Sequence, residues 1–488
     1  MTRTERARRG WLIDVRPLQV VAYRRMWLGS AASFFGFQFT AVAVPVQMYD
    51  LTRSSAWVGL LGVAALVPLL VMGLWGGAAA DALDRRRVLL ASSALACVAT
   101  AALLAQAVLG LDSPVLLLVL TAVQAAGFAV SSPTRQAIIP RLVPEELVPA
   151  ANTLGFTTMT AGGVFGPLAA GGIFAVSSTG GGVGIAYALD LALFTVTLWA
   201  TWRLPSIPPI AEAGEAGRAS AGLRGIADGL RFLFTRPVLL LSFGIDIVAM
   251  VLAMPRALFP QIAAERFGGG AAVGWLFSAI AIGSVLAGLT SGWIGRVRRQ
   301  GIALVVAVVG WGVAVGFAGF ATQLWLMVLL LAVGGAADLV SAVYRQSILQ
   351  TYAPDRMRGR LQGVFTVVVA GGPRLGDLRA GSTAELAGPV ASFAGGGFAA
   401  AGLAVLLAAA FPALLRYRTP AAQPLPPTGQ PPTGQPQPPP APPMQSQAAA
   451  PHLQAAAPHP QAAAPHPRSA VPQPWAALPS PEGDDAER

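Results

Sequence analysis

Four aspartates lie inside long apolar stretches, where an ionisable group could take up or release a proton. They are Asp190, Asp246, Asp338 and Asp377. A charged side chain at the centre of a membrane-spanning helix costs roughly 2.5–3.5 kcal/mol on insertion scales, so each should face a partner or a wet cavity. All histidines lie in the C-terminal tail, so a proton carried through the apolar region would have to use these carboxylates. The alternative is a structural role, through pairing with Arg256 or with a backbone group.

Charged residues also stand together in the apolar stretch at 359–383. Arg374 and Asp377 are three residues apart, so they share one face of a helix and can pair. If Arg374 and Arg379 face a cavity, they suit an anionic substrate that carries carboxylates or catecholates, because guanidinium groups bind such oxygens well. The alternative is a short helix whose cytoplasmic half is simply in contact with water.

Two segments 210 residues apart have nearly the same sequence. Arg-Gln-Ala-Ile-Ile at 135–139 returns as Arg-Gln-Ser-Ile-Leu at 345–349, and each is followed by a proline and an acid. The same offset maps Pro45 onto Pro255 and several glycines onto glycines. A duplicated, largely apolar chain predicts two related halves, the pattern of transporters in which one half rocks against the other.

The repeated arginines, Arg135 and Arg345, lie near the cytoplasmic ends of two predicted spans. A long basic side chain at such a position can extend to the membrane surface, which would explain each arginine alone. Their repetition, each with a proline and an acid downstream, indicates a pair of cytoplasmic gates.

The elements that would position these residues are membrane-spanning helices. The hydrophobic fraction of the chain is 54% and the charged fraction 11%, against about 25% charged residues in soluble domains, so most of the chain must have the bilayer as its solvent. About 20 apolar residues cross the hydrocarbon. Twelve such runs can be placed, at 27–50, 57–80, 88–110, 114–137, 150–176, 183–203, 237–263, 271–295, 301–320, 323–348, 359–383 and 387–416.

The arginines indicate how these spans are oriented. They gather before residue 27 and in the turns at 81–87, 296–300 and 349–360, whereas the loops on the other side offer only Arg53 and Arg266. Both termini are therefore expected on the cytoplasmic side. The net charge of +11 reports this orientation and not nucleic-acid binding.

The predicted organisation has five parts. These are a cytoplasmic N-terminal segment (1–26), a six-helix bundle (27–203), a cytoplasmic connector with a short amphipathic helix (204–236), a second six-helix bundle (237–416) and a disordered tail rich in Pro, Ala and Gln (417–488).

The turn after the second span combines a glycine, an acid and a basic cluster. It contains Gly77, Asp81, Asp84, Arg85, Arg86 and Arg87. This pattern resembles the cytoplasmic signature of the major facilitator superfamily, although Ala82 and Asp84 depart from it. The resemblance implies a close helix contact at the glycine and a charge relay that latches the inward face shut. An ordinary arginine-rich turn is the alternative. The equivalent turn at 292–299 has no acid, so Asp81 is expected to matter more.

The fifth span carries a run of small residues. It contains Gly162, Gly166, Pro167, Gly171 and Gly172. Such glycines let a neighbouring helix approach closely, and a proline bends the helix. The run resembles the antiporter motif of exporters in the same superfamily, with one extra residue after the proline. A plain packing seam is the alternative, and under either interpretation the helix would act as a hinge.

The duplication, the 77–87 turn and the 162–172 run together resemble the major facilitator superfamily over residues 20–416. Within it, the segments 43–47, 76–90 and 349–360 look like the enterobactin (siderophore) exporter group. The resemblance implies an all-α membrane protein with twelve transmembrane helices in two pseudo-symmetric six-helix bundles. It also implies a monomer in the bacterial inner membrane that exports a small organic molecule, most simply a siderophore, by alternating access coupled to protons.

The alternatives are a multidrug or macrolide efflux transporter and a membrane-embedded sensor or scaffold whose proline-rich tail binds partners. The apolar spans contain no constellation of catalytic or metal-ligating residues, so an enzyme, a cofactor and a bound metal are not expected. The chain has no lysine and hence no phosphate-binding loop of the Gly-Lys type, which argues against transport driven by ATP.

Overall fold

The computed structural model describes residues 14–177, 179–208 and 223–417. The side chains of a few helical residues inside these ranges, among them Gly77 and Asp81, also lie outside the description. The described residues are helical and contain no strand. This confirms the predicted all-α class, because a backbone in hydrocarbon must satisfy its hydrogen bonds within helices.

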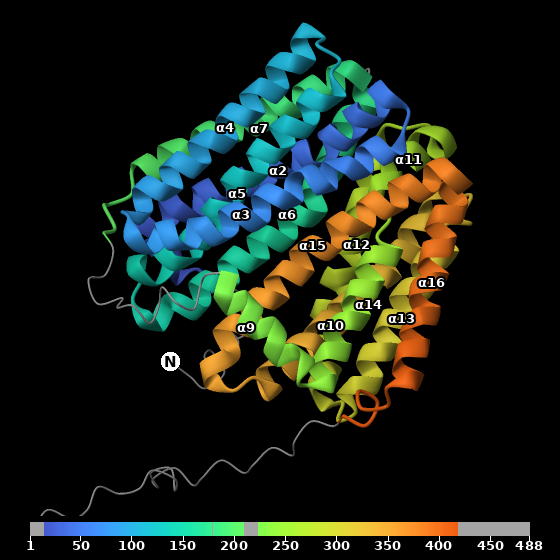
Figure 1. Cartoon of the computed structure of the whole chain (residues 1–488). Helices are drawn as coiled ribbons and strands as arrows, with labels where there is room; N and C mark the ends of the chain where they lie inside the picture. The colour runs from blue at the N-terminus through green and yellow to red at the C-terminus, as the bar shows by residue number, and fades with distance from the viewer. Residues whose placement is uncertain (1–13, 178, 209–222, 418–488) are drawn as a thin grey trace, which may run out of the picture. The chain divides into compact units, whose positions relative to one another are not determined.

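Six long helices form the first half of the chain (Figure 1). They are α2 (Val21–Thr52), α3 (Ser55–Ala82), α4 (Arg85–Leu109), α5 (Pro114–Leu142), α6 (Val148–Val176) and α7 (Thr179–Trp202). Local sequence sets their ends. Ser54 and Ser113 accept the backbone N–H of a residue in the first turn of α3 and α5. Gly110 ends α4 at a φ of 62°, a conformation that glycine adopts without steric cost.

The second half repeats this order after the connector helix α9 (Leu223–Phe234). Its helices are α10 (Pro237–Ala253), α11 (Phe259–Phe267), α12 (Ala271–Leu289), α13 (Gln300–Ala318), α14 (Leu324–Tyr352), α15 (Asp355–Ala387) and α16 (Pro389–Ala410). Eleven described segments are long and apolar enough to cross a membrane, with α10 and α11 counted as one. The remaining predicted span, at 359–383, corresponds to α15, which is 33 residues long but carries several charges.

The connector contains the helix expected from the sequence. Gly229 on α9 lies against the backbone of Arg360 on α15, and the Arg360 guanidinium forms an ion pair of 3.1 Å with Asp228. Residues 1–13 of the predicted N-terminal segment and residues 418–488 of the predicted tail lie outside the described residues.

The loops alternate between two ends of the bundle, because each long helix reverses the direction of the one before it. The turn at 83–84 and the segment at 297–299, both next to arginines, mark one end, here named the basic end. The loops at 53–54 and 268–270 mark the opposite end.

The repeat in the sequence is also a repeat in packing. Gly162 and Gly166 on α6 leave room for side chains of α2 in the same half, whereas Gly171 meets the backbone of Gly274 on α12 in the other half. The equivalent positions on α15 behave in the same way. Gly372 and Gly376 lie against α10 of their own half, and Gly381 lies against the start of α3 in the other half. In each half, therefore, one glycine-lined helix packs against both bundles.

Contacts between the halves gather toward the opposite end. The helix pairs α3 with α15 and α6 with α12 pack together across the two halves. Three hydrogen bonds among the described residues also join the halves: Tyr49 Oη to Glu265 Oε1 (2.7 Å), Ser55 Oγ to Gln261 Oε1 (2.7 Å) and Ser278 Oγ to the Val164 carbonyl (2.8 Å). The first two lie in or beside the loops that define the opposite end.

One predicted span is broken. The sequence predicts a single helix over 237–263, but the structure ends α10 at Ala253 and inserts a short 3-10 turn (Arg256–Leu258) before α11. Pro255 has no N–H, so the carbonyl four residues earlier loses its helical partner. Pro45 has the equivalent place and lies inside the continuous helix α2, so proline alone does not make the break. In the second half, Asp377 and Arg379 on α15 bind backbone groups on either side of the break.

Candidate functional site

A buried cluster of charges joins α10 and α14. Arg345 on α14 is 4% exposed and Asp246 on α10 is 2% exposed. The Arg345 guanidinium forms a hydrogen-bonded ion pair with the Asp246 carboxylate and donates to the Ser341 hydroxyl at 3.0 Å. Asp338, two turns earlier on α14, lies 3.9 Å from another terminal nitrogen of Arg345, and 31% of its side chain is exposed. Two carboxylates therefore share one guanidinium.

This arrangement corrects two expectations. Asp246 pairs with Arg345 and not with Arg256 or a backbone group, because α14 places a guanidinium directly against α10. Extension to the membrane surface is wrong for Arg345, since its side chain is covered by protein. Asp246, Asp338 and Arg345 by themselves have a formal charge of −1 when both acids are ionised, and the charge of Arg256 also acts on Asp338. One bound proton would make these three residues neutral, and the partly exposed Asp338 offers that proton an access route.

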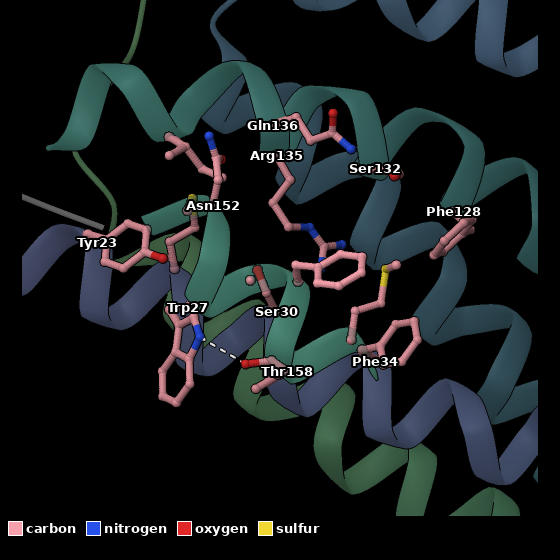
Figure 2. Close-up of a pocket in the computed structure, with 16 residues that line it drawn as sticks. Tyr23, Trp27, Ser30, Phe34, Phe128, Ser132, Arg135, Gln136, Asn152 and Thr158 are labelled. Carbon is pink, nitrogen blue, oxygen red and sulfur yellow. Dashed lines mark hydrogen bonds between the residues drawn. The ribbon is translucent and has the colours of Figure 1, made fainter. Parts of the chain in front are cut away.

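A cavity of about 390 Å³ surrounds Arg135 in the first half (Figure 2). Figure 2 shows the Arg135 side chain extending from α5 toward the side chains of α2 and α6. The cavity is lined by Tyr23, Met26, Trp27, Ser30, Ala31, Phe34, Phe128, Ser132, Arg135, Gln136, Ile139, Asn152, Gly155, Phe156, Thr158 and Met159. No acid is among these residues. The volume lies within the range of roughly 300–1,000 Å³ that is usual for small-molecule sites.

The two repeated arginines thus have opposite surroundings. Both keep a serine four residues earlier, Ser131 beside Arg135 and Ser341 beside Arg345. The acids that neutralise Arg345 have no counterpart in the first half: subtracting 210 from 246 and 338 gives Gly36 and Phe128. Sequence reasoning singled out both arginines but missed the aromatic and amide residues around Arg135. Those residues come from three helices, and no local pattern marks them as a group.

Asp190 lies in the interior of the first half. It is fully buried, accepts hydrogen bonds from Thr40 (2.5 Å) and Thr100 (3.3 Å) and is 3.5 Å from the Gln124 amide. The predicted requirement for a partner is met by neutral groups on α2, α4 and α5. A wet cavity at Asp190 is not what the structure shows, because those helices close around the carboxylate.

The charges of α15 support the break after α10. Arg379 donates to the carbonyls of Val251 (3.3 Å) and Leu252, in the last turn of α10. Asp377 accepts the backbone N–H of Ala257 at 3.1 Å, inside the short turn that follows. These two side chains therefore replace hydrogen bonds that a continuous helix would have made.

Three expectations for α15 change accordingly. Arg374 donates to the carbonyl of Ala370 at 3.2 Å, and the pairing with Asp377 that its spacing allowed does not form. Arg379 binds backbone carbonyls, so it is not one of two arginines facing a cavity. The wet short helix is also wrong, because α15 is long and Arg374, Asp377 and Arg379 lie in its half nearer the opposite end.

The arginine-rich turn packs on its own half of the chain. Arg85 donates to the carbonyl of Ala137 on α5 at 3.0 Å, and Arg86 donates to the carbonyl of Trp202 at 2.5 Å.

Asp84 caps α4 and accepts hydrogen bonds from Ser206 and the N–H of Ile207. Burial acts to raise the pKa of the Asp84 carboxyl, but these hydrogen bonds outweigh it and hold the pKa below its usual value. The latch expected here also needs a close contact at Gly77 and the carboxylate of Asp81. The surroundings of both residues lie outside the description.

The glycine run of α6 makes close contacts at most of its predicted positions. A Cβ at Gly162 would come within 2.6 Å of the Phe34 ring, and one at Gly166 within 2.5 Å of Gln38 Cβ. A Cβ at Gly171 would lie 2.7 Å from Gly274 Cα, whereas one at Gly172 would meet nothing within 4 Å. Helix α6 continues through Pro167. The seam is therefore confirmed at Gly162, Gly166 and Gly171, and Gly172 is not part of it.

Comparison with known proteins decides the family. Residues 14–432 match the family described as transmembrane secretion effector. The chain belongs to this family of the major facilitator superfamily. The enterobactin exporter EntS of Citrobacter koseri is 30% identical to it over 428 residues, which cover 86% of this chain and 98% of that exporter. The enterobactin exporter EntS of Escherichia coli is 30% identical over 421 residues, covering 84% and 97%.

Solved structures confirm the fold of the transporter. The nucleoside transporter NupG superposes with a TM-score of 0.62 at 18% identity and covers 81% of this chain and 99% of its own. A bacterial homologue of the lysosomal transporter Spinster, in an inward-facing and unoccupied conformation, also gives 0.62 at 18% identity, with coverage of 82% and 97%. The protein is thus a multi-pass membrane transporter of a small molecule and not an enzyme.

Proposed function

We propose that the transporter exports a siderophore of the enterobactin type from the bacterial cytoplasm, by alternating access and in exchange for protons. The single observation that carries the substrate class is the 30% identity to enterobactin exporters along nearly their whole length. The cavity around Arg135 adds support, since it has the size of a small-molecule site and an uncompensated positive charge. The transporter acts as a monomer in the inner membrane.

The contacts between the halves support the proposal of alternating access. The contacts of Gly171 with Gly274 and of Tyr49 with Glu265 hold the halves together toward the opposite end. The arginines mark the basic end as cytoplasmic under the positive-inside rule, which also places both termini there. Together these features support assigning the structure to an inward-facing state. Export requires these contacts to open while the cytoplasmic ends of the two halves come together.

The cytoplasmic gate is assigned to the residues of the 77–87 turn and to the repeated arginines. In the inward-facing state Arg85 and Arg86 bind carbonyls of their own half. We infer that Asp81 and the basic cluster of this turn latch the inward face shut in the outward-facing state. The seam of α6 around Pro167 serves as the hinge, because it contacts both halves.

Proton coupling is assigned to Asp246, Asp338 and Arg345. A proton that enters at the partly exposed Asp338 and passes to Asp246 removes the ion pair that joins α10 to α14, and its release into the cytoplasm restores that pair. A cycle in which a proton enters as the substrate leaves needs such a buried, two-state ionisable group. Asp190 is the less favoured candidate, because neutral hydroxyls and an amide surround it.

The substrate is tested by measuring siderophore in the culture medium. A strain that lacks the transporter is expected to secrete several-fold less siderophore than its parent under iron limitation. The wild-type gene should restore secretion. A gene truncated after residue 420 should also restore it, whereas a scaffold that acts through its tail would not work without that tail. Unchanged siderophore secretion in the deletion strain, together with lowered drug tolerance, would refute the siderophore assignment in favour of multidrug efflux.

A further inference from the structure

The guanidinium of Arg135 carries a charge that the described part of the transporter does not neutralise. Its one hydrogen bond in that part of the chain is to the Ser131 hydroxyl at 3.4 Å, and no ion pair forms there. The equivalent Arg345 is neutralised by two acids. A charge among apolar groups without a counter-ion is unfavourable, so the protein keeps Arg135 at a cost that a bound anion would offset.

The other side chains that line the cavity indicate the chemistry of the rest of the ligand. Aromatic rings from all three helices line the cavity, including Trp27 and Phe34 on α2, Phe128 on α5 and Phe156 on α6. Such rings favour offset or edge-on packing against another aromatic group. The amides of Gln136 and Asn152 add neutral hydrogen-bonding groups at the wall, and Figure 2 shows both beside the arginine.

We propose that this cavity is the binding site for an anionic aromatic group of the exported molecule, with the ring held among the phenyl and indole side chains and the anionic oxygens on Arg135. The proposal rests on the export function above and specifies its site. The second half cannot offer the same site, because Asp246 and Asp338 already neutralise the charge of Arg345. Substrate recognition is thereby assigned to the first half and proton coupling to the second.

The test is calorimetric titration of the purified full-length transporter in detergent with three probes. These are 2-naphthoate, its neutral analogue 2-naphthamide, and the non-aromatic anion cyclohexanecarboxylate. The wild type is expected to bind 2-naphthoate more tightly than either analogue. Arg135→Gln should weaken 2-naphthoate binding by roughly tenfold to a hundredfold, the range for a lost hydrogen bond to a charged group. It should leave 2-naphthamide binding within about twofold, which also shows that the cavity remains folded.

A matched pair of variants at Phe128 tests the charge argument independently. Phe128→Asp and Phe128→Asn both remove the same ring, but only the aspartate supplies the counter-ion that Asp338 supplies to Arg345. The aspartate variant should bind 2-naphthoate roughly tenfold more weakly than the asparagine variant. Equal affinities in this pair, or 2-naphthoate binding that is unchanged by Arg135→Gln, would overturn the site. A deletion strain with normal siderophore secretion would instead overturn the export function while leaving this binding result intact.

Discussion

Replacing Asp246 with alanine is expected to lower the free energy of unfolding by about 3 kcal/mol. Removing one partner of a buried ion pair leaves the other charge uncompensated, which typically costs about 3–5 kcal/mol. The lower end applies here because Asp338 remains 3.9 Å from Arg345 and retains part of the attraction. Unfolding of the purified transporter in mixed detergent micelles, followed by circular dichroism, measures the change. Siderophore export should fall to the level of the deletion strain.

The matched control removes both charges. Asp246→Asn combined with Arg345→Gln leaves two neutral groups that can still form a hydrogen bond. Asp338 loses its cation but is 31% exposed and can take up a proton from water, so most of the lost stability should return. Proton-driven export should not return, because the carboxylate is absent. If the double variant is as unstable as Asp246→Ala, the ion pair does not explain the stability of this region. If it exports normally, Asp246 does not carry the proton.

Introducing valine at Gly171 is expected to reduce siderophore export roughly tenfold or more. A Cβ there would lie 2.7 Å from Gly274 Cα on the other half, so α6 and α12 could not keep their approach. Overpacking of this kind typically costs about 1–3 kcal/mol, which shifts a two-state equilibrium by roughly fivefold to 150-fold. The state closed at the opposite end is thereby disfavoured, and the cycle slows.

The neighbouring residue provides the control. A Cβ added at Gly172, on the same helix, would have no atom within 4 Å, so Gly172→Val should export normally at equal amounts of protein in the membrane. Siderophore in the medium, divided by the amount of transporter on an immunoblot, compares the two variants. Equal export by both would mean that the approach of Gly171 to Gly274 is not required for transport.

Much of the fold follows from the sequence because long apolar runs in a bilayer leave the backbone few choices. The repeat of Gly162 and Gly171 as Gly372 and Gly381 even anticipates which helices touch both halves. The break after α10 could not be predicted, because Pro45 has the same place in the repeat and lies in a continuous helix. The break is stabilised by Arg379, which is 127 residues from the carbonyl of Leu252 that it binds.

The sequence predicts the candidate site only in part, for a related reason. Asp246, Asp338 and Arg345 each stand out as charges in apolar surroundings, but their grouping depends on contact between two helices whose paired residues are 99 positions apart. The cavity gives a weaker signal still, since tryptophan and phenylalanine are ordinary residues in a membrane helix. Among the residues that line the cavity, only Arg135 stands out in the sequence. The sequence does not show that Arg135 lacks a counter-ion, because that depends on how the chain folds.

Transport in proteoliposomes under an imposed pH gradient tests the account most directly. Vesicles loaded with acidic buffer and diluted into neutral buffer should accumulate radiolabelled siderophore above its external concentration. A protonophore should abolish this accumulation, and Asp246→Asn should lose it while still equilibrating siderophore across the membrane. Accumulation that is indifferent to the protonophore, or that persists in Asp246→Asn, would contradict the assignment of export to proton exchange at this cluster.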